Sequence, residues 1–247
     1  LRVVPVLLRA ECEQARVEAE RPMLERARRR AREVGVASTS IVRIGHDAAK
    51  AILETSIDRQ AQVIVLGWKG HTSTARRILG EITDRVVSQA PADIVLVKLV
   101  GDTLPSRLLV PTAGGRHALR AERYGADIAA AQGGELTVCS VIPPEPPEEL
   151  IESEQVRLEA TTARLVEETS LQTVASKIIR DHSVIDAIVN ETKNHEGVIV
   201  GAASQSFSNQ ILFGSIPDQI AKRANQTVIV VKHYQKVQAL FRRILRA

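Results

Sequence analysis

The sequence has few aromatic residues, few cysteines and no long apolar run. Only 2% of its 247 residues are Phe, Trp or Tyr, which leaves little for the stacked aromatic platforms that bind single-stranded nucleic acid. Cys12 and Cys139 offer neither a disulfide framework nor a metal-ligand spacing. No run approaches the ~18–20 apolar residues of a membrane span, and the start has no signal-peptide pattern. We therefore expect a soluble module in a reducing, cytoplasmic setting.

Residues that carry catalysis or bind metals do not cluster in this sequence. The six histidines show no paired ligand spacing, and no G-x-S-x-G elbow accompanies the serines near position 206. Five arginines lie between residues 26 and 32, but Glu25 and Glu33 flank them, which is typical of a solvated helix face. We predict no metal site, no catalytic residue, no nucleic-acid partner and no enzymatic activity.

Aliphatic residues are plentiful, and they fall into an internal repeat. Residues 63–98 align with residues 197–232 without a gap, and self-similarity of this length indicates a duplicated structural unit. Each copy predicts an apolar strand, a polar glycine-containing loop, an amphipathic helix and a second apolar strand, which is a βαβ crossover. Identical residues in the two copies include Gly67 and Gly201, Gly80 and Gly214, Asp84 and Asp218, Ala90 and Ala224, and Lys98 and Lys232.

The repeat extends upstream and predicts the domain organisation. Strand, loop and helix patterns precede both βαβ units, but only the second copy has a further strand at 107–111 and helix at 116–132. The completed pattern predicts an α/β protein with two tandem, doubly wound, five-stranded parallel-sheet domains. The first lacks its opening strand and helix, so we expect further chain before residue 1. The predicted divisions are residues 1–100, residues 101–232 and a basic amphipathic tail at residues 233–247.

A glycine motif in the first copy indicates a family. Gly67-Trp-Lys-Gly70 is followed by nine residues and then Gly80, which resembles the G-x2-G-x9-G-[S/T] motif of nucleotide-binding universal stress proteins. The resemblance covers nearly the whole chain. Glycines in such a loop let backbone N–H groups approach phosphate oxygens, and a helix start adds partial positive charge. The resemblance implies ATP or AMP as the ligand, if one binds, at Gly67, Lys69, Gly70 and Gly80 in the first copy and Gly201, Ser204, Gly214 and Ser215 in the second.

Both candidate sites depart from the family motif. Glu81 stands where the motif has Ser or Thr, and Ser204 replaces the middle glycine of the second copy. The family also carries an Asp after its first strand, in V-P-V-D-G-S, where this chain has Ala113. Both sites are therefore degenerate forms of the family site.

The leading hypothesis is a regulatory module of a membrane transporter. The variant motifs resemble universal stress protein domains that form the cytoplasmic C-terminal tail of amino acid permease-like or cation transporters. In the tail, Val237, Leu240, Phe241 and Ile244 form one helical stripe beside arginines, a pattern that favours contact with an acidic membrane surface or a partner. The resemblance implies tethering to the inner face of the cell membrane through a preceding transporter domain in the same chain.

Two alternatives stay open at this stage. One is a soluble tandem universal stress protein that binds ATP or AMP by itself; the other, an enzyme on a similar sheet, has no motif to support it. The family's edge strands commonly build dimers, so residues 93–98 and 227–232 are the interface candidates for a homodimer. The sequence leaves open whether these two strands pair with each other or with another chain.

Overall fold

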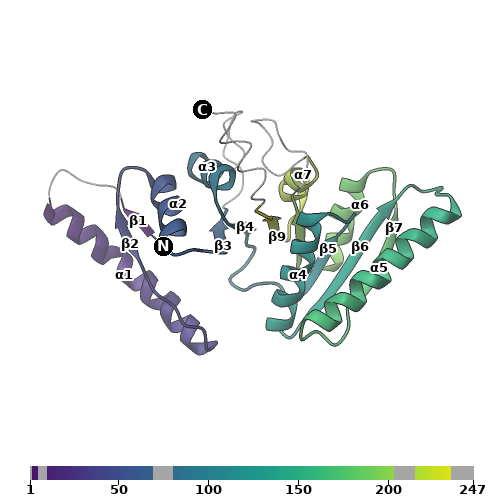
Figure 1. The fold of residues 1–247 in the computed structure, drawn as a ribbon, viewed down its shortest axis with the longest axis horizontal. Coiled ribbons are helices and arrows are strands. Elements are labelled where there is room, and N and C mark those ends of the chain that lie inside the picture. Colours follow the sequence, from purple (N-terminus) through teal and green to yellow (C-terminus); the bar gives the residue numbers. More distant parts are fainter. Residues whose placement is uncertain (1, 5–9, 69–79, 203–214, 235–247) are drawn as a thin grey trace. The chain divides into compact units, whose positions relative to one another are not determined.

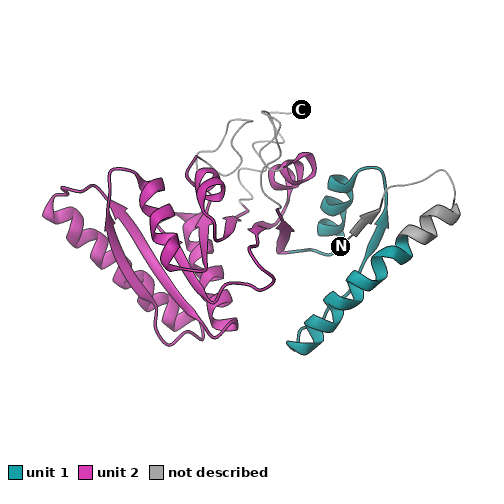
Figure 2. Ribbon diagram, turned by 180° about the vertical axis from the view of Figure 1, so that it is seen from behind, with its two compact units in different colours: residues 1–61 teal, residues 62–247 magenta. Residues whose placement is uncertain are grey.

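The computed structural model describes residues 2–4, 10–68, 80–202 and 215–234, with side chains from residue 17 onward (Figure 1). The chain divides into two compact units, Leu1–Ala61 and Gln62–Ala247 (Figure 2). This division is based on contacts between residues, and it does not coincide with the boundary between the two sequence copies. The domain boundaries at residues 100 and 232 therefore stay a prediction.

The first unit contains a two-stranded parallel sheet and two helices. Its elements are β1 (Arg2–Val4), α1 (Ala10–Glu33), β2 (Val42–Ile44) and α2 (Ala48–Asp58). β1 pairs with β2 from Arg2 opposite Val42 to Val4 opposite Ile44. The side chain of Asp47 accepts a hydrogen bond from the Lys50 N–H, which satisfies one of the free donors at the start of α2.

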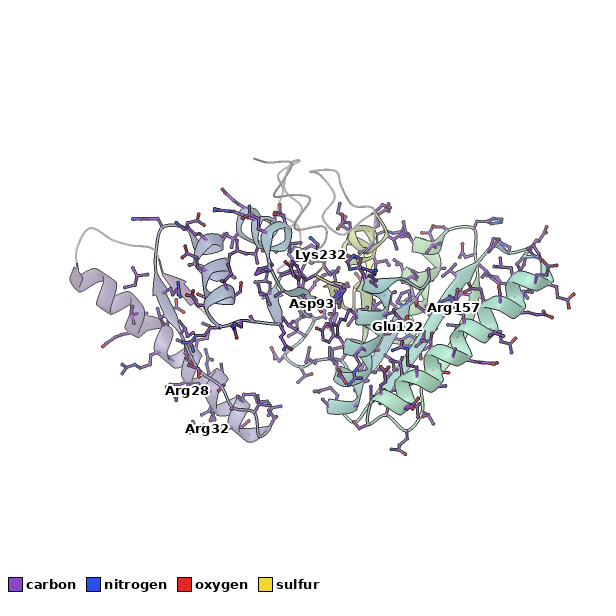
Figure 3. All side chains as sticks on the ribbon, viewed as in Figure 1. Arg28, Arg32, Asp93, Glu122, Arg157 and Lys232 are labelled. Carbon is purple, nitrogen blue, oxygen red and sulfur yellow. The ribbon has the colours of Figure 1, made fainter. Side chains whose placement is uncertain are left out.

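The arginine-rich segment forms the exposed face that its spacing predicts. All five arginines between residues 26 and 32 are exposed on α1, two of them labelled in Figure 3. Arg28 pairs with Glu25 and Arg30 pairs with Glu33, each at 3.1 Å and three residues apart. The positive charge of this helix is thus partly balanced within its own turns.

The second unit is built on one seven-stranded sheet. In spatial order its strands are β3-β4-β9-β8-β5-β6-β7, and all neighbours are parallel except β4 and β9. Its strands are β3 (Val63–Gly67), β4 (Asp93–Lys98), β5 (Arg107–Pro111), β6 (Glu135–Ile142), β7 (Ala175–Arg180), β8 (Gly197–Gly201) and β9 (Thr227–Lys232). Its helices are α3 (Glu81–Gln89), α4 (Arg116–Ala131), α5 (Glu148–Glu168), α6 (Val184–Glu191), the 3-10 turn η1 (Thr192–Asn194) and α7 (Ser215–Arg223).

The second copy of the repeat has the complete five-stranded arrangement. Its strands follow the order β7-β6-β5-β8-β9, with α4 and α5 packed together on one face and α6 and α7 packed together on the other (Figure 1). Leu108, Val110, Val138 and Ile199 are fully buried between the sheet and α4. The predicted α/β class with a doubly wound, mostly parallel sheet is confirmed.

The two copies share one sheet because their last strands pair with each other. β4 and β9 run antiparallel, with Leu96 opposite Val230 at the centre of the ladder. These two residues occupy equivalent positions in the repeat, so an approximate two-fold axis passes between them. The two strands predicted as interface candidates are therefore each other's partners, and within the described residues neither has a free edge.

Two equivalent lysines reinforce this junction reciprocally. Lys98, at the end of β4, donates from Nζ to the carbonyls of Ala221 and Ala224 at 3.1 and 2.8 Å. Lys232, at the end of β9, donates to the Val87 carbonyl of α3 at 2.8 Å. Each copy thus supplies a cation to the last carbonyls of the other copy's helix, where the helix dipole favours positive charge. Partial burial lowers the pKa of Lys98.

A buried carboxylate closes one end of the same junction. Asp93 is 6% exposed, and its Oδ1 accepts from the Tyr234 N–H and from Nδ1 of His233, both at 2.8 Å. Its Oδ2 accepts from the Tyr124 hydroxyl at 3.2 Å and lies 3.4 Å from Nε of Arg120 (Figure 3). Asp93 begins β4, whereas Tyr124 and Arg120 belong to α4, so the carboxylate connects the first copy to the second.

His117 completes this polar cluster from the first turn of α4. It is 7% exposed, and its Nδ1 accepts from the His233 backbone N–H at 2.9 Å. Burial lowers the pKa of His117, and the nearby His233 and Lys232 lower it further, against an opposing effect of Asp93. The neutral imidazole is therefore the form that fits this site.

No helix in the described part of the chain is both long enough and apolar enough to cross a bilayer.

We expect Lys98→Met to lower the free energy of unfolding by about 1 kcal/mol, because the variant keeps the apolar stem but loses two charge-assisted hydrogen bonds at a partly exposed site. For a chain of this size the melting temperature should fall by ~2–4 °C. Lys232→Met should have a similar effect, and the double variant should be close to additive because the two lysines serve different helices. Urea denaturation measures all three.

Lys193→Met is the matched control, because this exposed lysine donates to the side chain of Asn190 in its own segment and not to the end of a helix in the other copy. A loss for Lys193→Met equal to that for Lys98→Met would contradict a specific role for the reciprocal lysines.

Protonation of His117 should weaken the polar cluster in acid. Its pKa is lowered in the folded protein, so the unfolded chain binds the proton more readily, and stability falls as pH drops below the ordinary histidine value of 6.5. His117→Gln keeps a carbonyl acceptor for the His233 N–H but cannot be protonated. We expect the stability lost between pH 7.5 and pH 5 to be smaller in this variant than in the unchanged protein, as measured by urea denaturation.

The exposed His182 supplies the control, since His182→Gln should leave the pH dependence unchanged. Equal stability losses in the unchanged protein and in His117→Gln would rule out His117 as the acid-sensitive group.

Candidate functional site

The candidate ligand site lies where the strand order reverses. In the second copy β5 has β6 on one side and β8 on the other, so the crossover connections leave in opposite directions and a crevice is expected at the carboxyl ends of β5 and β8. The chain segments that follow these two strands lead into α4 and α7. Of the residues predicted for the two sites, the structure describes Gly67, Gly80, Gly201 and Ser215, while Lys69, Gly70, Ser204 and Gly214 lie outside the described residues.

In the second copy Gly201 allows the start of α4 to approach the end of β8. A Cβ atom at this position would lie 2.6 Å from the backbone N of Ala118 and from the carbonyl carbon of His117. Both are main-chain atoms that cannot move aside without shifting α4. The first glycine of the predicted motif therefore has a packing function in this copy, whatever else it contacts.

The starts of α4 and α7 follow strands β5 and β8 at this edge. Gly114 and Gly115 turn the chain into α4 with φ angles of 77° and 92°, a region that glycine adopts readily, and no side chain caps this helix. Ser215 is the exposed first residue of α7. Uncapped backbone N–H groups at a helix start bind phosphate or carboxylate oxygens. Ala113, also exposed, presents only a methyl group where the family has an acid.

In the first copy the corresponding edge is less complete. Gly67 ends β3, and Gly80 precedes α3 with a φ of 106° and no side-chain cap. Glu81 is the first residue of α3, where Ser215 stands in α7. A phosphate group would have to bind at this helix start. An acidic side chain there places a negative charge that repels it.

The starts of α3 and α7 also carry acids at equivalent positions, and the charges of these acids interact. Asp84 and Asp218 lie in the first turns of α3 and α7. The pKa of Asp218 is raised to about 6, chiefly by burial and also by the nearby charge of Asp84, while Lys222 acts in the opposite direction. The approximate two-fold axis thus brings the starts of α3 and α7 close enough for like charges to interact.

A buried acid that the sequence analysis did not single out lies beneath this edge. Glu122, in α4, is 1% exposed and accepts from the Thr112 hydroxyl at 2.5 Å (Figure 3). Arg164 of α5 donates to its other oxygen. Thr112 directly follows β5, and its buried hydroxyl donates to Glu122 and accepts from the Gly114 N–H at 3.2 Å.

A second cluster of polar side chains lies beside the carboxyl ends of β5 and β6. Arg157 donates to the Thr112 carbonyl and the Ser140 hydroxyl, both at 3.1 Å, and also pairs with Glu154. The Arg157 guanidinium holds the pKa of the Glu154 carboxyl below its ordinary value, helped by a hydrogen bond from Ser140. Because these groups satisfy one another, they fix the loop after β5 from below.

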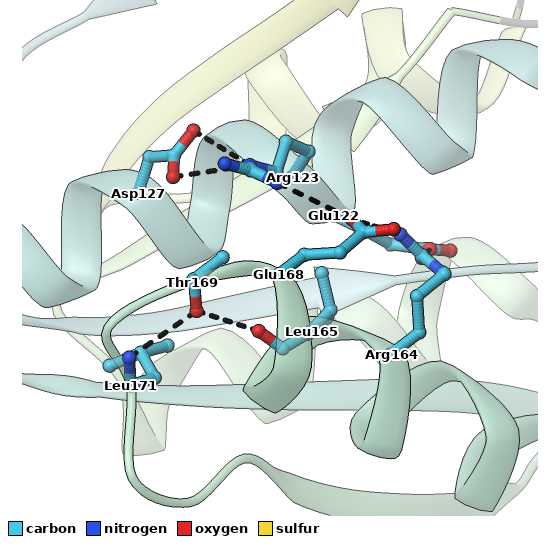
Figure 4. Close-up of polar contacts among 8 residues, drawn as sticks. All are labelled: Glu122, Arg123, Asp127, Arg164, Leu165, Glu168, Thr169 and Leu171. Carbon is cyan, nitrogen blue, oxygen red and sulfur yellow. Dashed lines mark hydrogen bonds and ion pairs between the residues drawn. The ribbon is translucent and has the colours of Figure 1, made fainter.

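Ion pairs continue this connection along the outer surfaces of α4 and α5. Arg123 bonds to both carboxylate oxygens of Asp127, at 3.2 and 3.1 Å, and lies 3.4 Å from Glu168 (Figure 4). Arg164 lies 3.2 Å from the same Glu168. This network joins the two helices that cover one face of the sheet.

A buried cysteine and a pocket lie elsewhere in the second unit. Cys139 is buried in β6, and burial raises the pKa of its thiol to about 12, which keeps it protonated at neutral pH. A pocket of about 520 Å³ is lined by residues around 133–137 and 170–175, at the amino ends of β6 and β7. It therefore lies at the opposite edge of the sheet. Within the described residues no group of His, Cys, Asp or Glu side chains could hold a metal ion.

Solved structures with the same fold come from archaea and bacteria. A universal stress protein from Archaeoglobus fulgidus DSM 4304 has a TM-score of 0.64 and 19% sequence identity, covering 93% of this chain and 85% of its own. A putative universal stress protein from Pseudomonas aeruginosa UCBPP-PA14 has a TM-score of 0.58 and 15% identity, covering 100% and 87%. These likenesses establish the fold.

A shorter universal stress protein from Archaeoglobus fulgidus, solved in complex with dAMP, covers 51% of this chain and 97% of its own at 20% identity, with a TM-score of 0.43. A comparison of the sequence with curated proteins found no match. The model of the universal stress protein family matches twice, over residues 2–98 and 105–232. The chain therefore belongs to the universal stress protein family and carries two tandem domains of it.

Proposed function

We propose that this chain is a regulatory module without catalytic activity that responds to an adenine nucleotide, ATP or AMP, through its second copy. One observation carries the proposal. In the second copy the carboxyl end of β5 is followed by an uncapped, glycine-led start of α4, and the start of α7 offers Ser215. Both helix starts belong to the edge where an α/β sheet of this order binds its ligands.

The first copy is the weaker candidate. Glu81 replaces the hydroxyl residue at the start of α3. The electrostatic difference between Glu81 and Ser215 is enough to make the two copies unequal toward phosphate, because like charges within a few ångströms repel strongly when partly shielded from water.

The module acts, in this proposal, as a cytoplasmic domain of a membrane transporter in the same chain. Support comes from the sequence of residues 233–247, which lies mostly outside the described residues. Its apolar stripe and its arginines Arg242, Arg243 and Arg246 suit an acidic membrane surface. To act as a switch, the nucleotide must bind two states of the module with different affinities.

The second candidate is a universal stress protein that binds nucleotide by itself, independently of any membrane. This candidate has the same nucleotide site in the second copy as the first proposal. It differs because its tail, residues 233–247, does not bind a membrane. The homodimer predicted from the sequence also stays a proposal, and it needs a surface other than β4 and β9, which are paired with each other.

Calorimetric titration of ATP and AMP into the full chain tests the site. We expect binding in the micromolar range, and Ser215→Glu should weaken it by about tenfold or more, since about 1.4 kcal/mol of repulsion is sufficient for that change. The variant reproduces in the second copy the acid that Glu81 places in the first.

Glu81→Ser is the matched control and should change the affinity by less than about twofold, because the first copy is not the proposed site. Absence of both heat and thermal stabilisation with either nucleotide would overturn nucleotide sensing and leave the module as a docking scaffold.

Sedimentation with lipid vesicles tests the tail. We expect the full chain to bind vesicles containing about one third phosphatidylserine, and the change of Arg242, Arg243 and Arg246 to Gln should abolish binding at physiological salt, since each basic residue near such a surface contributes about 1 kcal/mol.

The matched control changes three exposed arginines of α1, Arg28, Arg29 and Arg32, to Gln. Retention of binding in this control would attribute the effect to the tail and not to net charge. If both triple variants sediment with vesicles as the unchanged protein does, the membrane proposal fails and the independent universal stress protein is favoured.

A further inference from the structure

Thr112, the first residue after β5, is held through each of its polar groups. Its N–H donates to the Cys139 carbonyl of β6 at 2.8 Å, and its carbonyl accepts from Arg157 of α5 at 3.1 Å. Its hydroxyl donates to Glu122 of α4 at 2.5 Å and accepts from the Gly114 N–H at 3.2 Å. The residue is 5% exposed. Thr112 is thus fixed by a neighbouring strand and by both helices that cover one face of the sheet.

Glu122 sets the direction of the hydrogen bond between Thr112 and Gly114. A hydroxyl group has one proton to donate and rotates to suit its partners, whereas a carboxylate can only accept. Glu122 is 1% exposed, and Arg164 donates to its other oxygen (Figure 4). The Thr112 proton therefore points to Glu122, which leaves the lone pairs of the hydroxyl oxygen for the Gly114 N–H.

The segment that this relay holds has little rigidity of its own. Gly114 and Gly115 both have a positive φ, and glycine has the largest backbone freedom of any residue. The first helical hydrogen bond of α4 runs from the Leu119 N–H to the Gly115 carbonyl at 3.0 Å. The N–H groups of residues 115–118 come before it and have no acceptor within the helix. Their direction depends on how the glycine pair is held.

The buried position of Glu122 also keeps its charge from repelling an anionic ligand. Its side chain pairs with Arg164, so the buried pair carries no net charge. Glu81 in the first copy has the opposite placement, because it is exposed at the first residue of its helix. An acid of such a helix therefore supports or opposes phosphate binding according to where its side chain lies.

We propose that Glu122 is a positioning residue of the nucleotide site in the second copy. Through the Thr112 hydroxyl it holds Gly114, and so it directs the backbone N–H groups at the start of α4 toward the phosphate group of the ligand. Main-chain donors of this kind need no acid after the strand, which agrees with Ala113 at that position. The inference rests on the proposed nucleotide site and adds that α4 binds the phosphate.

Calorimetric titration of AMP into variants of the full chain tests this role. Thr112→Val keeps the shape of the side chain but removes the hydroxyl, and we expect AMP affinity to fall by about tenfold. Glu122→Gln should weaken AMP binding by about three- to tenfold, because an amide can donate to the hydroxyl and no longer fixes its proton. Thr112→Ser keeps the hydroxyl and should keep the affinity within about twofold.

Adenosine supplies a readout that a general structural effect would not give. It lacks the phosphate group, so Thr112→Val should change its affinity by less than about twofold in an NMR titration at millimolar concentration. Equal losses of affinity for AMP and adenosine overturn the proposal, because phosphate positioning predicts a loss for AMP alone.

Hydrogen exchange without ligand tests the loop itself. In Thr112→Val and Glu122→Gln the Gly114 amide should exchange at least about fivefold faster, whereas the β8 amides stay protected and show that the sheet is intact. Asp127→Asn is the matched control, because Asp127 is an exposed acid of the same helix that pairs with Arg123. It should change neither the exchange rate nor the AMP affinity, and losses equal to those of Glu122→Gln would oppose the proposal.

The remaining outcomes separate this proposal from the proposed function. AMP binding that Thr112→Val leaves unchanged overturns the positioning role alone and favours the start of α7 as the phosphate site. Absence of AMP and ATP binding in the unchanged protein overturns the proposed function and this inference with it. Unchanged exchange of the Gly114 amide in both variants also overturns the inference, since Thr112 then does not hold the loop.

Discussion

The antiparallel pairing of β4 and β9 is the contact on which the second compact unit depends. Without it the first copy would contribute only one parallel pair, β3 and β4, and two-stranded sheets are marginal in water. With it, these strands become part of a seven-stranded sheet whose core includes Val95 of the first copy beside Val231 of the second. The reciprocal lysines, Lys98 and Lys232, add directed hydrogen bonds to a ladder that hydrophobic burial alone would leave free to slip.

The junction follows a two-fold axis only approximately, and its departures explain why the two copies differ. At one end Thr227 accepts the Val100 N–H at 3.0 Å. At the equivalent end Asp93 accepts the Tyr234 N–H, and the charge is balanced by Arg120 of α4. A buried carboxylate is tolerable only with such partners. The acid lies on the side of the axis where α4 supplies such partners, Tyr124 and Arg120.

The sequence predicted much of this fold because repeat and periodicity point the same way. Both βαβ units and the opening strand and helix of the second copy lie where the patterns place them. The partner of β4 was not predictable, since the DIVLVK and TVIVVK runs are apolar on both faces and carry no register signal. The burial of Glu122 was not predicted, although an acid among small apolar residues of one helix is a signal of burial.

Gly201 shows that a residue of a ligand-binding motif can have a packing role that does not depend on the ligand. Gly201 fits the phosphate-loop motif, yet its immediate constraint is the backbone of α4, which no larger residue could face. The motif glycine after the strand is therefore a packing requirement of the doubly wound sheet before it is a ligand contact. It follows that a chain can lose the acid and the second glycine of the site, as at Ala113 and Ser204, and still keep this one. The glycine that remains in a degenerate nucleotide motif of this fold is consequently weak evidence for nucleotide binding and strong evidence for the contact between β8 and α4.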